Sequence, residues 1–162
     1  KTPEKPEKEP VLSPAYEYKH ASMRQTVRDV NRLFESSKFG EARRKIYDFL
    51  WGEFADWYIE SAKIQMEEGG DRAFYTAWTL VRVLDRCLRL LHPFTPFVTE
   101  ELWGHLKRAC QAKSAAFNPE DGWANALIVA GWPGSKPLED WEAIAVGYFP
   151  KPPIVPKKPF HF

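Results

Sequence analysis

The sequence of 162 residues predicts an all-α protein: a four-helix bundle with a short C-terminal strand or helix appendage. Three observations support this fold class. Apolar residues recur at alternating steps of three and four over four segments, which is the period of one helix face. Glycine, proline or polar stretches end these segments, as they end helices. The length is sufficient for one well-buried core.

The first two helices are expected over residues 21–36 and 40–68. The first has one apolar face, formed by Met23, Val27, Val30 and Phe34. The second would be roughly 40 Å long at about 1.5 Å per residue, and Gly69 with Gly70 ends it. Its apolar face is expected to consist of Tyr47, Leu50, Phe54, Trp57, Ser61 and Ile64. Among the aromatic residues, core positions are expected for Trp51, Phe54, Trp57 and Trp103.

The third helix, over residues 71–91, is apolar around so much of its surface that it should be central in the bundle. Its main face carries Phe74, Ala77, Val81, Leu84, Leu88 and Leu91, and beside them lie Leu80, Val83, Cys87 and Leu90.

A sharp corner is expected after this helix. His92 precedes Pro93 and should therefore leave the helical region. Thr95 is a suitable N-cap, and Pro96 suits the first position of a fourth helix. The apolar face of the fourth helix is expected to consist of Phe94, Val98, Leu102, Leu106 and Ala109.

The chain divides into four regions by composition. Residues 1–15 resemble a flexible charged linker, and residues 16–124 form the helical bundle. Residues 125–149 form a small appended segment, in which ALIVAGWP (126–133) predicts a strand or extended segment and residues 137–149 predict a short helix. Residues 150–162 form a Pro-rich tail. The chain does not begin with Met, so it is expected to be an excised fragment or a diverged piece of a longer protein.

The composition is that of a globular protein, since 44% of the residues are hydrophobic. A net charge of +1 argues against indiscriminate binding to nucleic acid, so a polyanion partner has to use a local patch. No apolar run approaches the roughly 20 residues of a membrane span, and a cytoplasmic location is expected. Cys87 and Cys110 are expected to be reduced core thiols. The histidines have no metal-ligand spacing, so no metal is expected.

The charges of the first two helices are unevenly distributed. Residues 24–45 contain seven basic and three acidic residues, a net charge of +4, whereas residues 48–68 contain one basic and six acidic residues, a net of −5. The second helix therefore begins basic and ends acidic, opposite to the preference of the helix dipole. Such a basic end with an aromatic residue nearby suits a phosphate backbone and splayed bases. A solvated polar face with incidental arginines is the alternative.

Catalytic signatures are absent from the sequence: there is no phosphate loop, nucleophile–base arrangement or metal motif. The carboxylate pairs Asp56 with Glu60 and Glu100 with Glu101 are typical of helix surfaces. A second basic row, formed by Arg82, Arg86 and Arg89, is expected to pair within the molecule. The chain is therefore interpreted as a binding or assembly module that is not an enzyme by itself.

Two longer segments resemble a known family. Residues 38–65 read KFGEARRKIYDFLWGEFADWYIESAKIQ, and residues 88–103 read LRLLHPFTPFVTEELW. Both resemble the anticodon-binding helical bundle of class I aminoacyl-tRNA synthetases, and residues 47–58 are most similar to the valine-type enzymes. ALIVAGWP resembles the strand that ends this domain. The likeness extends over residues 21–149, but the family's HIGH, KMSKS and Asp-Arg-Trp-Ile words and its editing domain are missing from this sequence.

The resemblance implies a module that binds the anticodon stem-loop of tRNA(Val) and positions it for aminoacylation by a catalytic domain outside this chain. It implies as partners the tRNA and the catalytic and editing domains of a parent synthetase, and a monomeric state is expected. ATP and Mg²⁺ would serve the full-length enzyme, with no cofactor in this chain. The expected RNA-binding residues are Arg24, Arg28, Arg32, Lys38, Phe39, Arg43 and Arg44.

Two alternatives remain open from the sequence. A protein–protein or scaffold module could have lost RNA binding and use its tails or Trp-rich end to dock a partner, which the near-neutral charge favours. An isoleucine-type anticodon-binding module is the other alternative.

Overall fold

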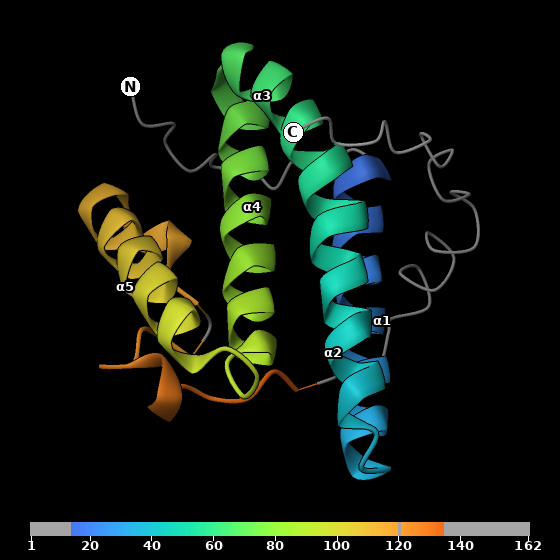
Figure 1. Cartoon of the computed structure of the whole chain (residues 1–162). Coiled ribbons are helices and arrows are strands. Elements are labelled where there is room, and N and C mark those ends of the chain that lie inside the picture. The colour runs from blue at the N-terminus through green and yellow to red at the C-terminus, as the bar shows by residue number, and fades with distance from the viewer. Residues whose placement is uncertain (1–13, 120, 135–162) are drawn as a thin grey trace, which may run out of the picture.

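The computed structural model describes residues 14–119 and 121–134 and confirms the all-α fold (Figure 1). Its main helices are α1 (Pro14–Glu35), α2 (Phe39–Tyr47), α4 (Gly70–Leu91) and α5 (Pro96–Lys113). The π-helical segment η1 (Asp48–Ile59) and helix α3 (Glu60–Glu67) continue α2 as one rod. Most of the predicted linker, the predicted helix 137–149 and the Pro-rich tail lie outside the described residues. No helix in the described part is both long and apolar enough to cross a bilayer.

Helix α4 lies at the centre of the bundle, as predicted (Figure 1). It packs against α1, α2, α3 and α5, and it supplies Val83, Cys87, Leu90 and Leu91 to the main core. Cys87 and the α5 residue Cys110 are free and buried, which confirms the prediction of core thiols. Burial raises the pKa of both thiols.

Helix α1 begins at Pro14, seven residues before the predicted start. Proline favours the first position of a helix because its φ angle is already helical. The early start adds the buried Tyr18 to the apolar face. The predicted face is confirmed at Met23, Val27 and Val30, which are buried.

The rod formed by α2, η1 and α3 turns a different face to the core than predicted. Its buried side chains are Ala42, Ile46, Phe49, Phe54, Tyr58, Ala62 and Gln65. The step of five between Phe49 and Phe54 falls in η1, where i→i+5 hydrogen bonding widens each turn and shifts the buried face. Tyr47, which precedes this step, is exposed, as is Ile64, and Trp51 is 55% exposed, so the prediction that these three belong to the core is wrong. The side chain of Trp57 lies outside the described ones.

The corner before α5 keeps its predicted position but differs in detail. Helix α4 ends at Leu91, yet His92 remains in the right-handed helical region, contrary to the prediction. The Leu91 carbonyl holds this turn because it accepts the N–H groups of Phe94 and Thr95 at 2.9 and 3.0 Å. Thr95 occupies the N-cap position, but its hydroxyl donates back to the Leu91 carbonyl and makes no cap hydrogen bond.

Helix α5 buries the face that contains Thr99, Trp103 and Cys110, one position away from the predicted one. Trp103 determines this register because its indole N–H reaches the buried carboxylate of Asp85 at 2.8 Å. Of the four aromatic residues named above for the core, Phe54 and Trp103 are therefore confirmed. On the outer side of α5, Val98 and Leu102 are half-exposed, and Phe97 is 91% exposed.

ALIVAGWP forms no strand in the described residues. Its centre is the short 3₁₀ helix η3 (Leu127–Val129), and extended backbone flanks it, so the extended-segment alternative is correct. A strand needs a neighbouring strand for its backbone groups. Here the Glu100 carboxylate replaces that neighbour, since it accepts the N–H groups of Leu127 and Ile128 at 2.6 and 3.2 Å.

Candidate nucleic-acid interface

A tight turn joins α1 to α2 and forms the hairpin end, defined here as residues 28–44. The N–H of Ser37 donates to the Phe34 carbonyl at 2.9 Å, and the N–H of Lys38 donates to the Leu33 carbonyl at 2.8 Å. Ser37 has a φ of +56°, a conformation uncommon for a residue other than glycine. The turn brings Phe39 against Phe34, with ring centroids 5.4 Å apart in an edge contact. Phe39 is thus held from one side while 50% of its surface faces solvent.

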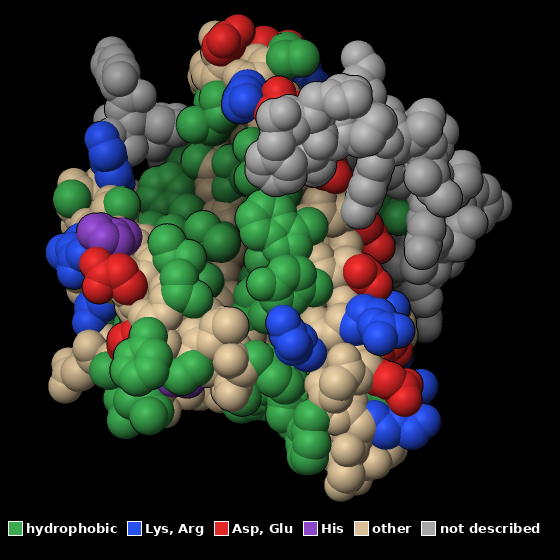
Figure 2. Space-filling model, in the orientation of Figure 1, with side chains coloured by type: hydrophobic (Ala, Val, Ile, Leu, Met, Phe, Trp, Pro, Cys, Tyr) green, Lys and Arg blue, Asp and Glu red, His purple; other side chains and the backbone are tan. Residues whose placement is uncertain are grey.

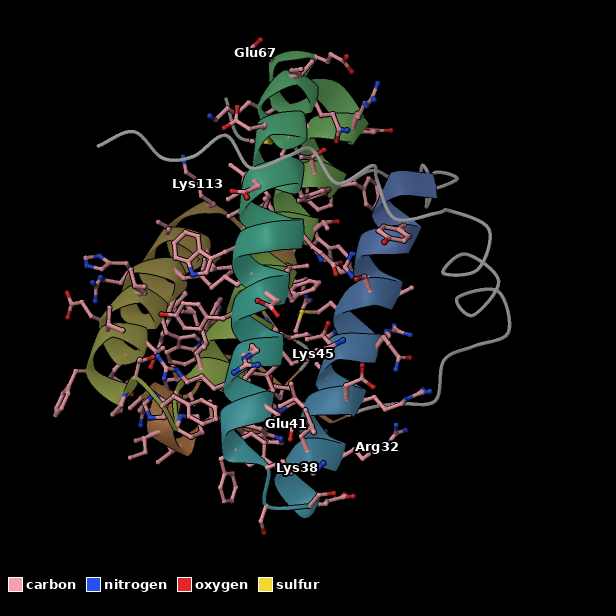
Figure 3. The ribbon with its side chains drawn as sticks, turned by 45° about the vertical axis from the view of Figure 1, so that its right-hand side comes forward. Arg32, Lys38, Glu41, Lys45, Glu67 and Lys113 are labelled. Atoms are coloured by element: carbon pink, nitrogen blue, oxygen red, sulfur yellow. The ribbon has the colours of Figure 1, made fainter. Side chains whose placement is uncertain are left out.

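Six of the seven predicted RNA-binding residues lie in the hairpin end, namely Arg28, Arg32, Lys38, Phe39, Arg43 and Arg44. Figure 3 shows Arg32 and Lys38 at this end and Glu67 at the opposite end of the rod. The predicted separation of a basic and an acidic end is therefore present in three dimensions.

The ion pairs of the hairpin end are weak. Lys38 pairs with Glu41 at 3.7 Å and Lys45 pairs with Asp29 at 3.3 Å, and both lysines are largely exposed. Exposed pairs contribute about 0–1 kcal/mol, so a polyanion can displace them. In residues 14–119 and 121–134, no ion pair involves Arg28, Arg32 or Arg44. Arg43 lies over the ring of Tyr47, 5.6 Å from its centroid.

Aromatic rings surround Phe34 beside the hairpin end. Phe94 from the corner lies 5.8 Å from Phe34, and Trp132 lies 5.3 Å away, between ring centroids. The indole N–H of Trp132 donates to the Asn31 side-chain carbonyl at 2.7 Å, and the Asn31 amide donates to the Pro133 carbonyl at 3.2 Å. Trp132 is 43% exposed and rigidly held, which suits a stacking surface.

Arg24 lies apart from the other six predicted residues. It lines a cleft of about 380 Å³ between α1, α4 and the segment that contains Trp132. We call this the arginine cleft and define it by Arg24, Arg82, Arg86, Arg89, Asp121 and Trp132. All three members of the second basic row thus share a cavity with a residue of the first row.

Arg89 is the structural member of the second basic row. Its guanidinium donates to Asp85 at 3.1 Å, to Asp121 at 2.8 Å and to the Gly131 carbonyl at 2.9 Å. The prediction of intramolecular pairing is therefore confirmed for Arg89, which attaches the C-terminal segment to α4. Burial raises the pKa of Asp121, but the hydrogen bond and charge of Arg89 outweigh burial, so the net pKa of this carboxyl is lowered.

Sequence reasoning did not identify Trp132, Arg82 and Arg86 as parts of this surface. The cleft joins residues more than 100 positions apart, so no local spacing predicts it. One available signal was Trp132 itself, since a tryptophan beside a proline after an apolar run suits a fixed, partly exposed aromatic surface.

Residues 20–148 match the protein family described as the anticodon-binding domain of tRNA ligase. The chain belongs to this family. The matched region includes the hairpin end, the corner and the arginine cleft, so the anticodon-binding domain contains the whole candidate interface.

Individual relatives of the anticodon-binding domain are named valine–tRNA ligases. One from Dehalococcoides mccartyi is 43% identical over 113 residues, which are 70% of this chain and 12% of the relative. One from Bacillus thuringiensis is 39% identical over 125 residues, 76% of this chain and 13% of the relative. One from Neisseria meningitidis is 44% identical over 94 residues, 57% of this chain and 10% of the relative. The chain thus spans about a tenth of the length of these relatives.

Proposed function

We propose that this chain binds the anticodon stem-loop of tRNA(Val) and holds it for aminoacylation by a catalytic domain of a parent valine–tRNA ligase. The observation that carries the proposal is the hairpin end, where α1 and α2 supply the cations of residues 28–44 and Phe39 is half-exposed. Cations bind phosphates without regard to sequence, and an exposed ring can stack on an unpaired base. We place the domain in the cytoplasm as a monomer.

The names of the relatives support the choice of valine, since several proteins that share 39–44% of the aligned residues are valine–tRNA ligases. In this proposal ATP and Mg²⁺ serve the catalytic domain. The anticodon-binding domain positions the tRNA: it holds the anticodon end so that the other end reaches the distant reaction centre.

The first test removes two cations from the hairpin end. Arg43→Ala plus Arg44→Ala should weaken binding of a valine-type anticodon stem-loop and flatten its salt dependence, because each lost phosphate contact lowers the slope of log K against log salt by about 0.7–0.9. Fluorescence anisotropy of the labelled stem-loop between about 50 and 200 mM salt measures both quantities.

The matched control is Lys63→Ala plus Arg72→Ala, which removes the same charge from exposed pairs at the acidic end. It should leave the slope unchanged. An equal loss of slope in both double variants would indicate a general charge effect and would contradict the assignment of the hairpin end.

One observation favours the protein–protein alternative. Phe97, Val98 and Leu102 expose apolar surface on α5, and Figure 2 shows hydrophobic side chains gathered on the face that α4 and α5 share. We propose that this face packs against the remainder of the parent synthetase, including its catalytic and editing domains. Failure of the chain to bind the stem-loop at any salt concentration would favour a scaffold role instead.

The isoleucine-type alternative requires a different comparison. Two stem-loops that differ only in the anticodon, one for valine and one for isoleucine, should bind unequally, with the valine version tighter. Tighter binding of the isoleucine version would replace valine by isoleucine in the proposal.

A further inference from the structure

Four exposed residues follow one another along the rod at steps of four, starting at the hairpin end. They are Phe39, Arg43, Tyr47 and Trp51. The exposed fraction is 50% for Phe39, 40% for Tyr47 and 55% for Trp51. Side chains four residues apart form a ridge on the surface of a helix. We call these four residues the aromatic ridge.

The change from α2 to η1 keeps the ridge close to one face of the rod. In an α-helix a step of four residues exceeds one full turn, because a turn takes about 3.6 residues. In η1, which begins at Asp48, i→i+5 hydrogen bonding widens each turn, so the same step falls short of a full turn. The excess in α2 and the shortfall in η1 have opposite directions. Trp51 therefore remains near the line of the three ridge residues that precede it.

The main core does not account for the aromatic side chains of the ridge. The rod contributes Ile46, Phe49 and Phe54 to that core, and neither Tyr47 nor Trp51 packs against it. Within the described part of the chain, the indole of Trp51 takes part in no hydrogen bond or ring contact. A single exposed aromatic residue needs no explanation, but a row of them indicates a binding surface.

The ridge combines aromatic rings with positive charge. The guanidinium of Arg43 lies 5.6 Å from the centroid of the Tyr47 ring. A guanidinium stacked in this way still carries N–H groups in its own plane, and these can donate to a phosphate. Arg44, the next residue, is also exposed. Residues 53–68 contain five acidic residues and one basic residue, so the surface that suits a polyanion ends near Trp51.

The spacing of the ridge suits a single strand with separated bases. At about 1.5 Å per residue, ridge residues in α2 are about 6 Å apart along the axis. Nucleotides in a stacked strand are only about 3.4 Å apart. A strand that follows the ridge must therefore unstack its bases, as nucleotides of a loop do when they bind aromatic side chains. A base-paired stem keeps its bases stacked and cannot bind in this way.

We propose that the aromatic ridge binds unpaired nucleotides of the RNA loop that the hairpin end holds. Bases stack on Tyr47 and Trp51, and Arg43 donates to a phosphate. The inference rests on the proposed function and extends its site from the hairpin end along the rod. Because every base has a flat face, stacking does not select a base. The ridge therefore adds affinity for an open loop and does not choose the anticodon.

The first arm of the test uses the 162-residue chain and the labelled valine-type stem-loop. Trp51→Ala should weaken binding about tenfold without changing the salt slope, since stacking releases no counterions. Trp51→Phe keeps an aromatic ring and should retain most of the affinity. The matched control is Phe97→Ala, which removes a 91% exposed ring from α5 and should bind like the wild type.

The second arm changes the RNA. A fully paired duplex with the sequence of the stem should bind the wild type and Trp51→Ala equally, because it has no unpaired bases to stack. Stem-loops with valine and isoleucine anticodons should lose affinity for Trp51→Ala by the same factor. Thermal unfolding checks the fold of each variant, and Tyr47→Ala carries the same comparison if Trp51→Ala unfolds.

The outcomes separate this inference from the proposed function. If the Arg43 and Arg44 double variant weakens binding while Trp51→Ala and Tyr47→Ala bind like the wild type, the ridge inference is overturned and the proposed function stands. An equal loss in Phe97→Ala, or an equal loss on the duplex, would show an effect unrelated to loop bases and would also overturn the inference. If the wild-type chain does not bind the stem-loop, both proposals fall.

Discussion

At the scale of single residues, the arginines of α4 differ according to their surroundings. Arg89 is buried with two carboxylates and a carbonyl, and it serves the fold. Arg86 and Arg82, one and two turns earlier, line a cavity that Arg24 also lines. The spacing of the row predicts one face for all three, and all three line the same cavity.

His20 gives a prediction at this scale, because its pKa of about 3 lies well below the ordinary value of 6.5. Between these values the unfolded chain binds a proton that the folded chain does not. The free energy of unfolding should therefore fall as the pH decreases from about 6.5, by about 1.4 kcal/mol per pH unit from this residue. Urea unfolding at several pH values measures the slope.

His20→Gln removes the titrating group and keeps a polar side chain beside Thr79. The difference in unfolding free energy between wild type and variant should thus change with pH between about 6 and about 4, with the wild type losing more. A constant difference over this range would mean that burial and the nearby arginines do not depress the pKa of His20.

At the scale of elements, the sequence predicts where the helices lie better than it predicts which face of each helix is buried. Helical spacing locates the helices because i+3 and i+4 neighbours share a face in any helix. It fails to select the buried face where two adjacent stripes are both apolar, as at Tyr47 and Ile46 or at Leu102 and Trp103. The hydrogen bond of Trp103 to Asp85, a tertiary contact, decides the second case, and the π-helical step at Phe49–Phe54 shifts the buried face farther along the rod.

Two glycines of the rod should respond in opposite ways to alanine. Gly52 lies within η1, and a methyl group there would meet no other atom within 4 Å, so Gly52→Ala should raise the free energy of unfolding by about 0.5–1 kcal/mol. Gly69 follows α3 with a φ of +72°, a conformation that residues with a side chain disfavour. Gly69→Ala should therefore lower the free energy of unfolding by about 1 kcal/mol or more. Urea denaturation measures both.

The two alanine variants control for each other, since each adds one methyl group to the rod. A destabilised Gly52→Ala variant would show that η1 does not tolerate the helical backbone that alanine favours. Unchanged stability in Gly69→Ala would indicate that the turn between α3 and α4 can relax.

At the scale of the whole molecule, the candidate site divides into a part that the sequence predicts and a part that it does not. The hairpin end lies within one continuous segment, so net charge and helical spacing suffice to identify it. The arginine cleft combines residues of α1, α4 and the segment around Trp132. Only the folded chain shows that Glu100 and Arg89 hold that segment in place.

The whole molecule is also electrostatically polar. Figure 3 shows Arg32 and Lys38, with Glu41 among them, at the hairpin end and Glu67 at the far end of the rod. This arrangement favours one orientation of a polyanion and keeps the acidic end away from it. The central claim is that RNA meets the hairpin end, and not the acidic end.

Backbone amide NMR shifts of the isotope-labelled 162-residue chain, titrated with the valine-type stem-loop, test this claim most directly. The account predicts that the largest shifts occur at residues 28–44 and 131–134, with little change at residues 60–68. Largest shifts at residues 60–68 or on the outer face of α5, with the hairpin end unchanged, would contradict it.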